Sequence, residues 1–202
     1  MQLQTEKRHY TLEQYLESEE TAEYKNEYLD GEIIPIAGVT TNHNKICLNF
    51  CRNFPLTINT QNYDIYMESV RLWIPDYNFY TYPDIMVIQG QPIYHGRGQS
   101  NITNPQIIIE VLSQSTQGYD RFAPLRDRSD KFRYYRSIPI FQEYILISQY
   151  NYSVEQYRKQ SADTWLISFY EGENATLPLA SVDWQISLQD LYQRIDFQLV
   201  EE

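Results

Sequence analysis

Cysteines, long apolar runs and basic residues are all scarce in this chain of 202 residues. Two cysteines, Cys47 and Cys51, are too few for a disulfide framework, so we expect a protein of the reduced cytoplasm. The first twenty residues contain no apolar stretch, which predicts neither a signal peptide nor a membrane span. No repeat or linker interrupts the chain, and its length predicts a single domain over residues 1–202.

Positive charge is in deficit, with 16 Lys and Arg against 27 Asp and Glu and a net charge of −11. Proteins that bind nucleic acid without regard to sequence usually rely on a basic surface, so the total charge argues against that class. The distribution is uneven, however, because residues 16–32 are acidic and residues 121–136 are strongly basic. A divalent cation in an acidic cleft can also reverse the local field. A metal-dependent enzyme that acts on nucleic acid therefore remains compatible with the charge.

The hydrophobic pattern predicts an α/β protein with a mixed central sheet, flanking helices and additional β-hairpins. Thr11 is the expected N-cap of a first helix, Pro55 is expected to end a second, and Asp30-Gly31 predicts a hairpin turn. Helices are predicted at residues 10–20, 41–54, 129–139 and 187–195, the last capped by Ser187, and strands at 65–75, 82–90, 105–113, 141–149, 153–160, 164–172 and 181–188.

Glu110 interrupts the apolar segment "PQIIIEVL", whose pattern is typical of a central strand covered on both faces. An isolated ionised carboxylate in such surroundings costs on the order of 5 kcal/mol unless a partner or a cation compensates it. Asp84, in "YPDIMVI", begins the preceding predicted strand of this sheet. Because neighbouring strands lie about 4.8 Å apart, the two carboxylates could share one Mg²⁺ or Mn²⁺ ion. The alternative for Glu110 is an ion pair with an arginine such as Arg121.

Two further residues complete the candidate site. Glu32 opens the strand after the hairpin turn and supplies a third carboxylate. Lys131 lies in the helix after the Glu110 strand and can project back to offset charge on a phosphate. Each has a structural alternative, since Glu32 could be a solvent-facing hairpin residue and Lys131 an exposed helix residue.

The order of these parts resembles the PD-(D/E)xK nuclease superfamily. The segments "YPDIMVI", "PQIIIEVLSQSTQGYDR" and "DKFRYYRSIPIFQEYILISQ" are similar to a bacterial family of restriction-type endonucleases often filed as a domain of unknown function. This resemblance, which runs from about Tyr10 to Gln193, implies a restriction-endonuclease-like fold. It also implies Mg²⁺-dependent hydrolysis of DNA, with Asp84 and Glu110 as metal ligands and Glu32 as an additional acidic residue.

One departure from the superfamily pattern concerns the lysine expected two residues after the second acid, where this chain has Leu112. In the bacterial family a lysine from the following helix takes its place, which makes Lys131 the candidate. The missing lysine and the acidic total also leave room for a second function, a non-catalytic domain of this fold that acts in binding or assembly. A third is a phosphodiesterase that acts on RNA or another phosphoester. A homodimer stays open as the assembly.

The sequence evidence for accessory site residues is less specific than that for the acids and the lysine. His43 is a candidate for the edge of the catalytic cleft, and Ser113 and Ser115 could bind a phosphate or cap the next segment. His43, Cys47 and Cys51 share one face of the predicted helix, but their spacing matches no common zinc motif, so buried structural cysteines are the preferred interpretation.

Overall fold

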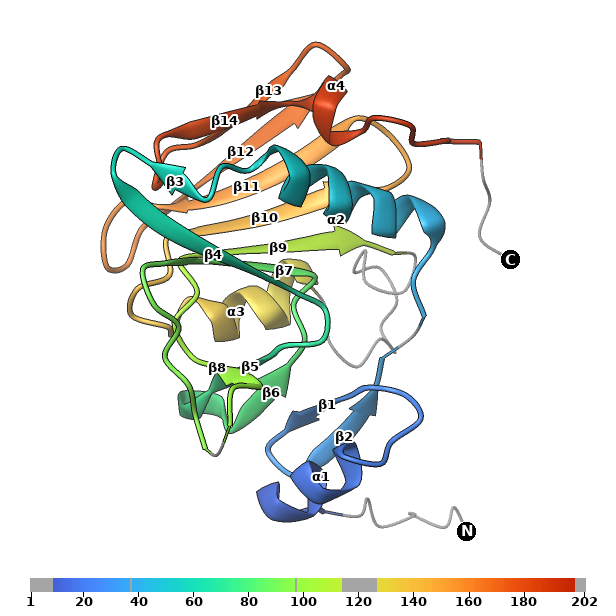
Figure 1. Cartoon of the computed structure of the whole chain (residues 1–202), viewed down its shortest axis with the longest axis vertical. Helices are drawn as coiled ribbons and strands as arrows, with labels where there is room; N and C mark the ends of the chain where they lie inside the picture. The colour runs from blue at the N-terminus through green and yellow to red at the C-terminus, as the bar shows by residue number, and fades with distance from the viewer. Residues whose placement is uncertain (1–8, 37, 97, 114–126, 199–202) are drawn as a thin grey trace, which may run out of the picture.

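A seven-stranded mixed sheet forms the centre of the fold in the computed structural model, which describes residues 9–36, 38–96, 98–113 and 127–198 (Figure 1). Every residue of the central strand is buried, as its apolar sequence predicts, and this strand pairs in parallel with one neighbour and antiparallel with the other. In spatial order the strands are β12 (Trp165–Glu171), β11 (Ser153–Lys159), β10 (Glu143–Ser148), β9 (Ile107–Leu112), β7 (Ile85–Gln89), β4 (Gln61–Met67) and β3 (Thr57–Ile58).

A second sheet of five strands lies below the first in Figure 1, with helix α1 (Leu12–Glu19) beside the hairpin of β1 (Asn26–Leu29) and β2 (Glu32–Pro35). The prediction of one strand over residues 65–75 is wrong, because the chain turns at Glu68, whose φ is 37°. The first half of that segment therefore joins the seven-stranded sheet and the second half the five-stranded sheet. The five strands are, in spatial order, β2 (Glu32–Pro35), β1 (Asn26–Leu29), β6 (Phe79–Thr81), β5 (Arg71–Ile74) and β8 (Asn101–Ile102). A 3₁₀ turn, η1 (Pro75–Tyr77), connects β5 to β6.

The two faces of β9 pack against different layers because successive side chains of a strand point to opposite sides. Ile107, Ile109 and Val111 share a core with helix α2 (Thr41–Asn53) and the C-terminal elements. Ile108 and Leu112 share another core with helix α3 (Phe132–Tyr135) and residues of the second sheet. The C-terminal elements are the hairpin of β13 (Thr176–Leu179) and β14 (Trp184–Ser187) and the short helix α4 (Leu188–Leu191).

The helix ends follow the capping chemistry of the sequence. Thr11 forms the expected capping box with Gln14, and the Ser187 side chain caps α4. Helix α2 ends at Asn53, two residues before Pro55, as predicted. The helix predicted at 129–139 is shorter than expected, because a π-helical turn, η2 (Asp127–Lys131), leads into a single α-helical turn. The strand β13 was not predicted, and none of the helices in the described ranges has the length and apolar character to cross a membrane.

Candidate active site

The register of β7 against β9 explains why Asp84 and Glu110 meet. The pairs end at Ile85 opposite Ile109, and one further step along this antiparallel ladder places Asp84 opposite Glu110. The Asp84 backbone N–H lies 3.4 Å from Glu110 Oε2, a long hydrogen bond. The two carboxylates therefore belong to adjacent strands at the point where the ladder ends.

Asp84 is held from the α2 side of the sheet. Its Oδ2 accepts a hydrogen bond from the Val111 backbone N–H at 2.7 Å and lies 3.0 Å from His43 Nε2. His43 is buried and is placed by the first turn of α2, where its backbone N–H is capped by the Thr40 side chain. The side chain of Asp84 is 15% exposed, so the carboxylate remains within reach of solvent.

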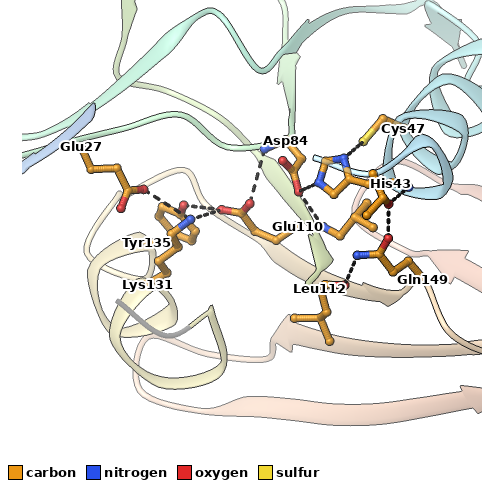
Figure 2. Close-up of polar contacts among 11 residues, drawn as sticks. Glu27, His43, Cys47, Asp84, Glu110, Leu112, Lys131, Tyr135 and Gln149 are labelled. Atoms are coloured by element: carbon orange, nitrogen blue, oxygen red, sulfur yellow. Dashed lines mark hydrogen bonds and ion pairs between the residues drawn. The ribbon is translucent and has the colours of Figure 1, made fainter. Parts of the chain in front are cut away.

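Glu110 is held from the α3 side and is only 3% exposed. Its Oε1 accepts a hydrogen bond from the Tyr135 hydroxyl at 2.7 Å and lies 3.3 Å from Lys131 Nζ (Figure 2). Burial, followed by the negative charge of Glu110, raises the pKa of Tyr135 well above its ordinary value of 10.0. The phenol therefore stays protonated and acts as a donor. Because Lys131 and Tyr135 are four residues apart along one helical face, one element supplies both partners.

Glu27 is a carboxylate of this cluster that the sequence interpretation did not select. Its Oε1 lies 3.4 Å from Lys131 Nζ and accepts a hydrogen bond from Thr81 Oγ1. Glu32, the hairpin residue proposed from the sequence, lies at the start of β2 with an exposed side chain. The hairpin thus brings Glu27, from β1, beside Lys131 (Figure 2).

The two strand carboxylates offer oxygen donors for a metal ion. Asp84 and Glu110 come from adjacent strands at the end of one ladder, and the side chain of Asp84 is still partly exposed to solvent. Oxygen donors on adjacent strands fit the hard ions Mg²⁺ and Mn²⁺. The residues present therefore suit the metal that the sequence interpretation expects.

The remaining sequence candidates surround this cluster. Leu112, at the position of the usual lysine, is buried in the core on the α3 side. Ser113 follows β9 directly and is half-buried. Ser115 and Arg121 lie outside the described residues. The Gln149 side chain donates to the Leu112 carbonyl at 2.9 Å and accepts from Thr40, which ties the start of α2 to the end of β9.

Of the two cluster residues that the sequence interpretation did not select, Tyr135 could have been predicted from the sequence and Glu27 could not. Tyr135 could have been found, since it stands four residues after Lys131 on a predicted helix. Glu27 could not, because the hairpin contains three acids, Glu27, Asp30 and Glu32, and only the packing of the second sheet decides which one is buried.

Comparison with known proteins agrees with this architecture. Residues 12–189 match the sequence profile of the Uma2 family, described as "Putative restriction endonuclease". Two uncharacterized proteins of Synechocystis sp. are similar. The protein sll1609 is 44% identical over 167 residues, which are 83% of this chain and 90% of the relative. The protein slr1290 is 30% identical over 185 residues, or 92% of each chain.

A crystal structure from Anabaena variabilis, described as "a putative nuclease belonging to DUF820", has the same fold. It matches with a TM-score of 0.61 and 21% sequence identity, over 91% of this chain and 97% of that chain. The predicted fold class is thereby confirmed. With the family profile covering most of the sequence, the chain belongs to the Uma2 family and has the restriction-endonuclease-like fold of the PD-(D/E)xK nucleases.

Proposed function

We propose that the protein is a Mg²⁺-dependent endonuclease that hydrolyses phosphodiester bonds of DNA. The observation that carries the proposal is the convergence of Asp84, Glu110 and Lys131 at the end of the β7–β9 ladder. Two carboxylates at adjacent strand ends, with an ammonium group beside one of them, are groups that hydrolysis of a phosphodiester uses, and family membership supports nuclease chemistry.

Asp84 and Glu110 would hold the metal ion. When bound, Mg²⁺ polarises a phosphoryl oxygen and lowers the pKa of its water. Lys131 stabilises the negative charge that develops on the phosphate, from a position already fixed beside Glu110. Tyr135 and Glu27 are positioning residues, since the first orients Glu110 and the second holds the ammonium group of Lys131. His43 orients Asp84 in the same way from the opposite face.

Cleavage of supercoiled plasmid in Mg²⁺ or Mn²⁺ tests this proposal. We expect nicked or linear product from the native protein and none from Glu110→Gln or Asp84→Asn. Lys131→Gln should lose about 100-fold or more in rate, because it removes one charged stabiliser of the transition state. Lys159→Gln, at the end of β11, is the matched control and should cleave normally. Cleavage that persists in Glu110→Gln would contradict the assignment.

Thermal melting separates metal binding from catalysis. Mn²⁺ or Ca²⁺ should raise the melting temperature of the native protein, because an ion that binds only the folded state stabilises it. The Asp84→Asn, Glu110→Gln double variant should show no shift. A labelled RNA substrate in parallel distinguishes the third function, since cleavage of RNA alone would contradict DNA as the substrate. A metal-dependent shift without cleavage of either substrate would favour the non-catalytic alternative.

A further inference from the structure

A second group of metal-binding side chains lies next to the proposed Mg²⁺ site. His43, Cys47 and Glu68 each present a donor atom within 4.8 Å of the other two. His43 and Cys47 are four residues apart on one face of α2, while Glu68 comes from the turn between β4 and β5. The sequence pattern along α2 had paired these two residues with Cys51, which does not belong to the group of three.

Glu68 is held in place by its backbone. Its N–H donates to the Asp84 carbonyl at 3.2 Å, and its own carbonyl accepts from Lys25 Nζ at 3.3 Å. Its carboxylate oxygen Oε1 is buried and has no hydrogen-bond partner among the described residues. A buried carboxylate oxygen without a partner is costly, and a cation would compensate it.

The two ring nitrogens of His43 face different neighbours. Nε2 lies 3.0 Å from Asp84 Oδ2, and Nδ1 lies 3.9 Å from Cys47 Sγ (Figure 2). A metal-ligating histidine commonly donates its other ring N–H to a carboxylate, which fixes the tautomer and the orientation of the ring. Asp84 occupies the position of that carboxylate, and Nδ1 is the nitrogen that faces Cys47.

We infer that His43 Nδ1, Cys47 Sγ and Glu68 Oε1 form a site for a divalent ion of the Zn²⁺ class, distinct from the hard-metal site at Asp84 and Glu110. One nitrogen, one sulfur and one oxygen ligand with an open fourth position suit zinc, whereas Mg²⁺ avoids sulfur. Zinc bonds of about 2.0–2.3 Å place neighbouring ligands about 3.3–3.8 Å apart. Side-chain rotations that shorten the donor separations by up to about 1.5 Å would therefore close the site around the ion.

Binding requires the Cys47 thiol to lose its proton, so one proton passes to solvent as the metal–sulfur bond forms. The bound ion would hold His43 with its Nε2 proton directed at Asp84. The inferred ion therefore acts as a positioning group for the neighbouring carboxylate, and its binding does not depend on the proposed hydrolytic activity.

Titration with Co²⁺ tests the site, using the protein without an affinity tag, stripped with a chelator and kept reduced. We expect one equivalent of Co²⁺ to produce thiolate-to-metal absorption in the near ultraviolet. One equivalent of Zn²⁺ should abolish this absorption, and excess Mg²⁺ should not. Absence of the band in the native protein would overturn the inference, as would its displacement by Mg²⁺.

Variants identify the ligands. Cys47→Ser should lose the band, and Cys51→Ser, one turn further along α2, should retain it. Because a substitution at buried Cys47 can impair folding, Glu68→Gln provides a second measure and should weaken Co²⁺ binding at least tenfold, with unchanged circular dichroism. A band lost only in Cys51→Ser, or unaltered affinity in Glu68→Gln, would contradict the ligand set. Glu110→Gln should keep the band while losing DNA cleavage, which separates failure of this site from failure of the proposed function.

Discussion

Lys131 forms ion pairs with two buried carboxylates. Its ammonium group contacts both Glu110 and Glu27, at 3.3 and 3.4 Å, and the residue as a whole is 8% exposed. Held between two acids, it cannot swing into solvent as an exposed lysine would. A group fixed in this way stabilises a transition state without reorganising at the moment of reaction. A substitution of Glu27, which holds the Lys131 ammonium group, therefore tests the role of Lys131 as directly as a substitution of the lysine itself.

Glu27 and Glu32 form a matched pair of acids in one hairpin. Glu27→Gln should lower kcat about tenfold or more with little change in KM, because it removes the charge that positions Lys131. Glu32→Gln, at an exposed site, should change kcat less than about twofold. Steady-state kinetics on a labelled duplex measures both. The reverse order of effects would return the role to Glu32, the residue selected from the sequence.

At the residue scale, the sequence alone identified the acids that face each other. A carboxylate inside "IIIEVL" has few structural explanations, and the register that brings Asp84 opposite it follows from two adjacent strands. Glu68 was not identifiable, because the pattern of residues 65–75 reads as one continuous strand. Only the turn at that position, which sends the two halves to different sheets, brings its carboxylate to His43.

At the element scale, Glu143 ties the C-terminal hairpin to the central sheet. From the start of β10 it accepts hydrogen bonds from the Ser181 backbone N–H at 2.6 Å and from the Gln156 side chain at 2.7 Å. The residue is fully buried. Burial raises its pKa above the ordinary value of 4.5, although these hydrogen bonds oppose that shift.

This raised pKa predicts a specific dependence of stability on pH. The folded protein keeps the Glu143 proton over a range in which the unfolded chain has released it. The free energy of unfolding should therefore fall as pH rises from about 4.5 through the raised pKa, by at most about 1.4 kcal/mol per pH unit. Denaturant unfolding at a series of pH values should show that Glu143→Gln removes this part of the slope. Exposed Glu173→Gln serves as the control, and an unaltered slope in Glu143→Gln would refute the prediction.

Element boundaries were less predictable than element types. The buried strands β9 and β10 are evident from their apolar runs, and Thr11 and Ser187 mark helix starts through their side-chain chemistry. The five-stranded sheet is not evident, because its strands are two to four residues long and show no extended alternation. Its existence depends on contacts between distant segments, such as β1 with β6.

At the scale of the whole molecule, the net charge of −11 opposes the binding of a polyanion such as DNA. Without a divalent cation, the acidic cluster and the overall charge both repel DNA. We therefore expect the metal ion to be required for DNA binding as well as for cleavage.

Fluorescence anisotropy with a labelled duplex can check this expectation. The native protein should bind at least tenfold more tightly in Ca²⁺ than in a chelator, since the ion reverses the field at the carboxylates. The Asp84→Asn, Glu110→Gln variant should lose that dependence and bind more tightly than the native protein in the chelator, because it lacks two negative charges. Equal affinity of the native protein under both conditions would contradict the argument.

The parallel pairing of β9 with β10 has a consequence for how such proteins are recognised. Parallel neighbours cannot be joined by a tight turn, and α3 lies in the connection between these two strands. It lies on the face to which Glu110 points, so a lysine in this connection meets the same carboxylate as one placed two residues along the strand. A lysine at a different position in the sequence can thus place its ammonium group beside the same carboxylate. Sequence searches that require a fixed interval between acid and lysine will overlook proteins built in this way.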